Sequence, residues 1–507
     1  MPPGTRWAIF SAAGRTGVNE GAANARLFVS WLARFAPLAI VTALTFPAAI
    51  AARTVAHPRQ APVATGIPGV DQRQLSADFW IARLPRPDHV ALDATAIAER
   101  NAMIEQRDAS LHDLPSLPRT LDGARVSEWL MRTSRRPAAA LFDEAGRVVA
   151  AATLDALVAN ANMDGVPARQ PTRYGLAVRR ASLRTFPTSQ RVFSSTGDVD
   201  LDRFQESALF PATPVVIAHA SRDGDWWFVI TPTYAAWVPK SAIAEASRSQ
   251  VLDYIRQRPS RRVTGAIVRT TTTPENRRVS DLQLDMGVRL PLATMPPGTA
   301  VNGQHPAASW AVLMPVRNDD GTLALTPTLV PRSADTAAGD LPLTPSNVIR
   351  QAFKFLGERY GWGEDYDARD CSGFVSAVFA SMGVVLPRNT GDQARNPAFT
   401  HLHFDAASTR AARMATVRSL QAGDLVYLPG HVMLVLGRMG DVPYVIHDIH
   451  DGKYLDTTGG LQSMHLNGVV VTPLPTLRLD ANRDFVDGIT DVVSMLDGRL
   501  PPADARP

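Results

Sequence analysis

The sequence predicts an α+β protein built from several small domains, on three observations. Its 507 residues are 45% hydrophobic and 20% charged, which is typical of globular protein. A chain of this length is expected to form about three or four domains. Short runs of β-type residues fill the middle of the chain, whereas the C-terminal third combines a helical apolar pattern at 374–382 with strand-like runs after 423.

The helical pattern directly follows Cys371, the only cysteine of the chain. Apolar side chains recur at helical spacing through 374–382, and the preceding segment 360–370 has the glycines and charges of a loop. The thiol is therefore expected at the start of a buried helix. Amide groups and the dipole at a helix N-terminus lower the pKa of a thiol and favour the nucleophilic thiolate. The alternative is an inert core residue, which is the more common state of a solitary cysteine.

Two histidines belong to strand-like runs further along the chain. His431 opens an apolar run that ends at 437, and His447 ends the run that begins at 443. If these strands are antiparallel neighbours, His447 can lie beside His431 and fix its tautomer and orientation. Core packing is the alternative for both. His450 competes with His447, because strand alternation points the two side chains to opposite faces.

Several separate motifs carry a resemblance to a known family. In order along about 345–475, they are Tyr360-Gly361-Trp362-Gly363, Asp370-Cys371-Ser372-Gly373-Phe374, Leu386-Pro387-Arg388, Gln393, Gly423-Asp424-Leu425 and Gly430-His431-Val432. This window resembles the NlpC/p60 family of cell-wall cysteine peptidases. The resemblance implies a papain-like catalytic domain, which we place at 342–475, with a triad of cysteine, histidine and a third polar residue.

Carried over position by position, the resemblance implies that Cys371 is the nucleophile, His431 the general base and His447 the third polar residue. It also implies the substrate, which is the bond from γ-D-glutamate to a diamino acid, usually diaminopimelate, in peptidoglycan stem peptides or muropeptides. It implies no cofactor. Acyl transfer to water through a thiolate suits these residue types.

Six further residues are expected to bind substrate: Tyr360, Trp362, Asp370, Ser372, Thr390 and Tyr234. Tyr360 and Trp362 are expected to line one side of the cleft. Thr390 occupies a position where relatives often have serine. Asp370 with Ser372 resembles the pair that binds the free amino group of L-alanine in large relatives, since a carboxylate suits an ammonium group. A helix N-cap is the alternative for Asp370, and both roles can coexist. If the pairing holds, the enzyme trims released muropeptides that carry an unsubstituted L-Ala.

The chain before this window resembles the larger members of the family, which carry an N-terminal stabilising segment and two bacterial SH3-like domains. We expect the helical stabilising segment at 53–175, the first SH3-like domain at 176–250 and the second at 260–335. A faint repeat between 177–187 and 266–274 suggests two copies of one β module. In the first copy the aromatic residues are expected mainly in the core, with Tyr234 leaning over the catalytic cleft.

The two ends of the chain complete the predicted layout. Residues 1–52 place four arginines before a short apolar stretch and small residues at 49–51, as in a signal peptide or an N-terminal anchor. We therefore expect export to the periplasm or cell envelope, with no integral membrane domain beyond that possible anchor. A single cysteine suits an oxidising compartment. Residues 476–507 are expected to form a polar tail, with a helix at 487–496.

Charge and histidine spacing exclude other classes of function. The net charge is only +4 and the arginines are scattered, so no nucleic-acid partner is expected. The histidines at 401, 403, 431, 447 and 450 lack a zinc-binding spacing, so no metal is expected. Two alternatives to the peptidase stay open. They are a non-catalytic SH3-like wall-binding protein and a papain-like amidase or acyltransferase.

Overall fold

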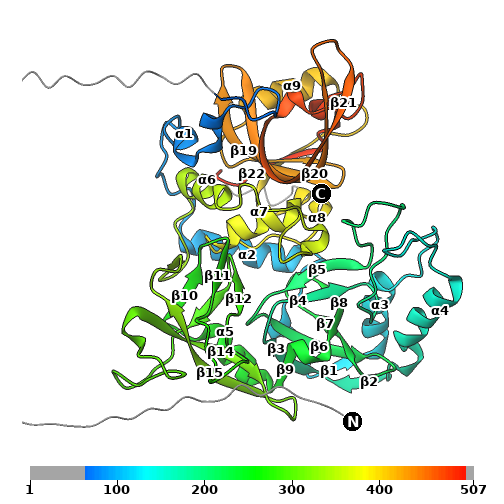
Figure 1. The fold of residues 1–507 in the computed structure, drawn as a ribbon, viewed down its shortest axis with the longest axis vertical. Coiled ribbons are helices and arrows are strands. Elements are labelled where there is room, and N and C mark those ends of the chain that lie inside the picture. Colours follow the sequence, from blue (N-terminus) through cyan, green and yellow to red (C-terminus); the bar gives the residue numbers. More distant parts are fainter. Residues whose placement is uncertain (1–62, 498–507) are drawn as a thin grey trace, which may run out of the picture. The chain divides into compact units, whose positions relative to one another are not determined.

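The computed structural model describes residues 63–497 (Figure 1). The predicted signal peptide or anchor at 1–52 lies outside the described residues, as does the end of the predicted tail. Within 63–497, every helix is too short or too polar to cross a bilayer.

The segment that precedes the β domains is mainly helical. Its helices are α1 (Ala77–Ile81), α2 (Ala94–Arg107), α3 (Gly123–Thr133) and α4 (Ala151–Asn160), and two short strands, β1 (Thr120–Asp122) and β2 (Arg169–Pro171), pair with each other. Asp93 caps α2 by accepting a hydrogen bond from the amide of Ala96. Asn101 of α2 exchanges hydrogen bonds with the backbone of Gly383 and Val385, so this helix is tied to the C-terminal domain.

The first β domain is a seven-stranded antiparallel sheet in the order β5-β4-β8-β7-β6-β3-β9. Its strands are β3 (Arg173–Ala177), β4 (Ala181–Arg184), β5 (Gln205–Leu209), β6 (Pro214–Ala220), β7 (Trp226–Ile230), β8 (Ala235–Pro239) and β9 (Ile243–Ala246). Phe228 and Trp237 are fully buried and meet edge to face, so the predicted placement of the aromatic residues in the core is confirmed for them. Helix α5 (Arg248–Arg256) follows.

The second β domain consists of three small sheets around one apolar cluster. The strands are β10 (Ser260–Val263), β11 (Ile267–Arg269), β12 (Gln283–Asp285), β13 (Arg289–Pro291), β14 (Ser309–Arg317), β15 (Leu323–Pro331) and β16 (Thr336–Ala337). Leu290 of β13, Leu284 of β12 and Met314 of β14, one from each sheet, share its core.

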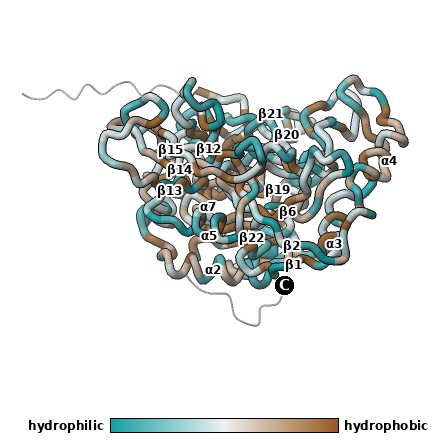
Figure 2. The backbone as a smooth tube through the Cα atoms, turned by 90° about the horizontal axis from the view of Figure 1, so that it is seen from below, coloured by the Kyte–Doolittle hydropathy of each residue, from teal (hydrophilic) through white to brown (hydrophobic). Residues whose placement is uncertain are grey.

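The C-terminal domain packs helices against a six-stranded sheet in the order β17-β22-β18-β19-β20-β21. Its helices are α6 (Pro345–Phe353), α7 (Cys371–Ala380), α8 (Thr390–Ala394) and α9 (Arg410–Ser419), and its strands are β17 (Thr400–His403), β18 (Leu425–Leu428), β19 (His431–Met439), β20 (Val442–Leu455), β21 (Leu461–Pro473) and β22 (Asp491–Ser494). The predicted helix after Cys371 is confirmed as α7. Apolar segments gather around α7 in Figure 2, and Phe374 and Phe379 are fully buried there.

The predicted helix at 487–496 is wrong. Residues Asp491–Ser494 form β22, which pairs with β17 on one side and β18 on the other. Val492 and Val493 are β-branched and buried, which favours a strand between two partners. The segment after 476 is therefore not only a polar tail, because it supplies an internal strand of the catalytic sheet.

A charge placed in β22 tests this correction. We expect Val493→Asp to lower the stability of the chain by several kcal/mol, since Val493 is 1% exposed and an unpaired buried carboxylate costs about that much. The matched control is Val148→Asp, at a valine that is 63% exposed. Thermal and urea unfolding measure both variants. Small and equal losses of stability in the two variants would contradict the assignment of β22 to the sheet.

Candidate active site

Cys371 is the first residue of α7, where the sequence places it. The residue before it, Asp370, is the N-cap, and its Oδ1 accepts a 2.9 Å hydrogen bond from the amide of Gly373. The thiol is 5% exposed, and its Sγ lies 3.8 Å from the carbonyl oxygen of Gly430. Since Gly430 directly precedes His431, the sulfur lies beside the start of β19.

The expected lowering of the thiol pKa is wrong for this structure. Burial raises the pKa of Cys371 to about 12, and the charge of Asp370 acts in the same direction. The helix N-terminus favours the thiolate, but removal of the sulfur from water outweighs it. Burial therefore favours the neutral form of this thiol.

The two predicted histidines lie side by side. Strands β19 and β20 are antiparallel, and His431 Nε2 and His447 Nδ1 are 2.8 Å apart. The other ring nitrogen of His447, Nε2, lies 2.9 Å from Thr472 Oγ1 on β21. This bonding leaves His431 Nδ1 as the ring nitrogen available to a reacting group. The sequence analysis missed Thr472, because no motif marks the strand that carries it.

Burial keeps both imidazoles neutral. It lowers the pKa of His431 to about 4 and holds the pKa of His447 well below its usual range, to which the neighbouring His431 also contributes. A neutral thiol beside a neutral imidazole can exchange a proton only when a substrate or a changed environment stabilises the resulting charges.

Both carboxylate oxygens of Asp370 accept hydrogen bonds from neighbouring protein groups. Burial acts to raise its pKa, but the charge and hydrogen bonds of Arg388 lower it. Arg388 donates to both oxygens, at 3.1 and 2.7 Å, and Ser372 Oγ donates to Oδ1 at 3.0 Å. Gly363 donates its amide to Oδ2. The N-cap role is thus confirmed for Asp370, and Arg388 balances the charge of its carboxylate.

A second carboxylate, which the sequence analysis missed, lies on the first β domain. Glu206 of β5 accepts hydrogen bonds of 2.5 Å from Tyr234 Oη and from Thr185 Oγ1. Burial and the charge of Glu206 raise the pKa of Tyr234, on which the charges of Arg388 and Asp370 also act. Tyr234 therefore lies within reach of the charges of Arg388 and of Asp370, the N-cap of α7, and its place over the cleft stays a prediction. No motif marks Glu206, so its position follows only from the pairing of β5 in the sheet.

The other predicted site residues differ in their surroundings. Tyr360 is 8% exposed, and its pKa is raised by burial and next by the charge of Cys371, which places its phenol near the thiol. Trp362 begins the short 3-10 helix η6 (Trp362–Glu364), and the guanidinium of Arg203 lies 5.0 Å from its ring. Thr390 opens α8 and is half-buried; in the described structure it makes no hydrogen bond to another predicted site residue.

One more buried acid lies next to the triad. Asp448 follows His447, is fully buried, and both its carboxyl oxygens lack a hydrogen-bond partner within 63–497. Burial raises its pKa well above the usual range, and the charge of Asp370 adds to this. Burial therefore favours the protonated form of this carboxyl group.

A cavity of about 740 Å³ opens beside the histidines. Its lining includes His431, His450 and Phe485, together with Leu201 from the first β domain. Its size falls within the range of small-molecule sites. The cavity therefore opens onto the imidazole of His431, whereas Cys371 is not among its lining residues.

The comparisons with known proteins agree with this geometry. Residues 357–472 match the model of the NlpC/P60 family, and residues 191–239 match the model of an SH3 domain of SH3b1 type. Residues 357–472 therefore form an NlpC/P60 domain. The predicted resemblance and the α+β fold are thereby confirmed, and the SH3 match falls on the first β domain.

The proteins that this chain is similar to include peptidases. The gamma-D-glutamyl-L-lysine dipeptidyl-peptidase of Bacillus cereus is 27% identical over 256 residues, which are 43% of this chain and 69% of the relative. The probable endopeptidase p60 of Listeria seeligeri is 49% identical over 47 residues, 9% of each chain. The solved NlpC/P60 endopeptidase of Photobacterium damselae subsp. piscicida shares the fold, with a TM-score of 0.66 at 18% identity over 84% of this chain and 97% of that one.

The buried imidazole of His431 predicts a pH-dependent stability. Its pKa in the folded state is about 4 against 6.5 ordinarily, so between these pH values the unfolded chain binds the proton and the folded chain does not. Lowering the pH through this window removes stability, by about 1 to 3 kcal/mol from this group. We expect His431→Gln to flatten the dependence of the thermal midpoint on pH from 7 to 4. His403→Gln, at a side chain that is 61% exposed, is the control. If the thermal midpoint varies with pH in the same way for the parent and both variants, His431 is not the source of this pH dependence.

Proposed function

We propose that this protein is a cysteine peptidase that hydrolyses the bond between γ-D-glutamate and a diamino acid in peptidoglycan stem peptides. The observation that carries the proposal is the position of the Cys371 thiol at the start of α7, against the residue before His431, whose imidazole is bonded to His447. The similarity to the Bacillus cereus gamma-D-glutamyl-L-lysine dipeptidyl-peptidase supports the bond type.

The reaction we assign is acyl transfer to water. Cys371 Sγ attacks the γ-carbonyl carbon while its proton passes to His431 Nδ1, and the carbonyl π electrons move to oxygen. The backbone amide of Cys371, at the start of α7, is a donor for that oxyanion. When the C–N bond breaks, His431 returns the proton to the leaving amine. His431 then takes a proton from water, the hydroxide attacks the thioester, and the free acid and the thiol are released.

The neutral resting pair fits this sequence of steps. Because burial favours the neutral thiol, the thiolate forms as it attacks rather than beforehand. His447 holds His431 in the orientation that presents Nδ1, and Thr472 holds His447 in turn. The role of these two residues is to position the base.

In this proposal Glu206, rather than Asp370, binds the free amino group of the N-terminal L-Ala. Asp370 is neutralised by Arg388, whereas Glu206 has no cationic partner among the described residues. Its carboxylate and the phenol of Tyr234 can accept and orient an ammonium group at the end of the cleft. A substrate with a free amino terminus would be a released muropeptide, so the enzyme would trim fragments, after export to the periplasm or cell envelope.

Removal of the nucleophile tests the proposed chemistry. We expect Cys371→Ala to reduce kcat/KM for L-Ala-γ-D-Glu-diaminopimelate by about a thousandfold or more, because no other described thiol can form the acyl intermediate. Mass spectrometry of the products measures the rate, and circular dichroism checks that the variant is folded. Hydrolysis at the parent rate would reject the cysteine mechanism, and products cut elsewhere would favour an amidase.

The ammonium site is tested separately. We expect Glu206→Gln to raise KM for the free tripeptide by about ten- to a hundredfold, the loss of about 1.4 to 2.8 kcal/mol of a charge-assisted contact. The matched control is Glu144→Gln, at a carboxylate that is 64% exposed. The parent enzyme should also discriminate against the N-acetylated tripeptide, and Glu206→Gln should not. Equal rates on both peptides for the parent would show that no ammonium anchor operates.

A further inference from the structure

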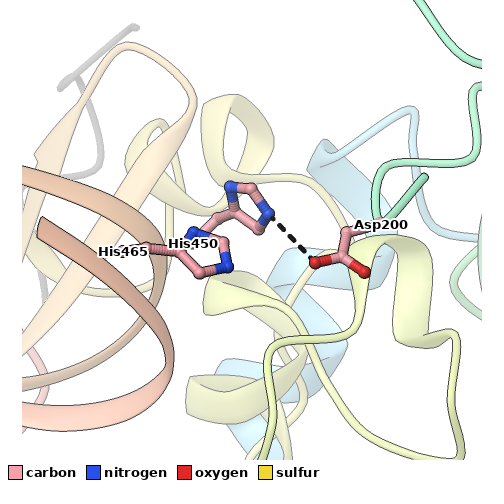
Figure 3. A group of neighbouring side chains, drawn as sticks. All are labelled: Asp200, His450 and His465. Atoms are coloured by element: carbon pink, nitrogen blue, oxygen red, sulfur yellow. Dashed lines mark ion pairs between the residues drawn. The ribbon is translucent and has the colours of Figure 1, made fainter. Parts of the chain in front are cut away.

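A cluster of two imidazoles and one carboxylate lies at the junction of the first β domain and the catalytic sheet. Figure 3 shows the ring of His450, from β20, and that of His465, from β21, facing Asp200, which lies in the loop before β5. One ligand atom from each residue lies within 4.8 Å of the others. His450 Nε2 and Asp200 Oδ2 are 3.5 Å apart.

A single carboxylate orients both imidazoles. The two oxygens of Asp451 lie 2.6 Å from His450 Nδ1 and 2.8 Å from His465 Nδ1. Each Nδ1 therefore carries the proton, and each Nε2 keeps a lone pair. Histidines that bind metals characteristically donate their second ring nitrogen to a carboxylate in this manner. His450 Nε2 is buried and has no hydrogen-bond partner within 63–497, so its lone pair is unused.

The third residue of the cluster is also held in place. Arg359 donates to Asp200 Oδ1 at 2.7 Å, and Asn467 donates to Oδ2 at 3.1 Å. These contacts fix the plane of the carboxylate, and Oδ2 keeps a second lone pair on the side of His450. Three ligand atoms of the types that Zn²⁺ prefers thus converge from three separate segments.

We propose that Asp200, His450 and His465 bind a divalent transition-metal ion of the Zn²⁺ class. Ligands about 2.0 to 2.1 Å from a tetrahedral ion are about 3.3 Å apart, close to the 3.5 Å that separates His450 Nε2 from Asp200 Oδ2. His465 is 58% exposed, so its ring is free to move toward the ion and shorten the longer separations. Water would complete the coordination.

The ion would clamp one wall of the catalytic cleft. It would tie the loop of the first β domain to β20 and β21, and His450 lines the same cavity as His431. The ring of His450 also lies 5.8 Å from the ring of Tyr360. The ion touches no reacting atom in this arrangement, so its role is to hold the two domains together. Spacing along the chain does not reveal such a site, because Asp200 is remote in sequence from both histidines.

Zinc binding by the untagged chain tests the proposal. The parent for the test is Cys371→Ala, because the buried thiol would otherwise compete for zinc. We expect calorimetric titration with ZnCl₂ at pH 7.5 to give one ion per chain and a raised thermal midpoint. His465→Gln and Asp451→Asn should each weaken binding by about ten- to a hundredfold.

The matched control is His403→Gln. His403 is 61% exposed, pairs with Asp491 and lines the same cavity, but lies outside the cluster. Its affinity for zinc should equal that of the parent. The absence of saturable binding to the parent would overturn the proposal, as would binding that survives His465→Gln or is lost with His403→Gln. None of these readouts depends on peptidase activity.

Discussion

The site depends on one buried ion pair, between Arg388 and Asp370. Asp370 caps the helix that begins with Cys371, and Arg388 donates hydrogen bonds to both of its oxygens. Arg388 Nε also donates to Ser207 of the first β domain at 2.7 Å, and Ser207 in turn donates to Glu364. Removal of one partner from such a pair typically costs about 3 to 5 kcal/mol, because the other charge is left buried. The same contact thus fixes the start of α7 and joins the two domains.

This pair also sets the electrostatics of the thiol. Asp370 adjoins Cys371 and raises its pKa, and Arg388 opposes that effect only in part. With His431 kept neutral by burial, the site holds its proton on sulfur until a substrate enters. The ion pair that stabilises the start of α7 therefore also affects the free energy of deprotonating Cys371.

The sequence predicted those parts of the site that depend on local patterns. The helix at Cys371 and the strands of His431 and His447 follow from periodicity and motifs. A motif does not show how deeply a side chain is buried, so the predicted lowering of the Cys371 pKa was wrong. Contacts between segments distant in sequence determine the positions of Glu206, of Thr472 and of Arg388, the partner of Asp370. The same holds for the strand Asp491–Ser494, whose own sequence predicted a helix. The boundaries of the domains stay a prediction.

The central claim is that the chain performs acyl transfer through Cys371 on a γ-D-glutamyl peptide. Its most direct test is an affinity label, L-Ala-γ-D-Glu chloromethyl ketone, followed by peptide mapping. The account predicts loss of activity in proportion to alkylation of Cys371 alone, with protection by the tripeptide substrate. Full alkylation of Cys371 with activity retained, or inactivation by labelling of another residue, would contradict it.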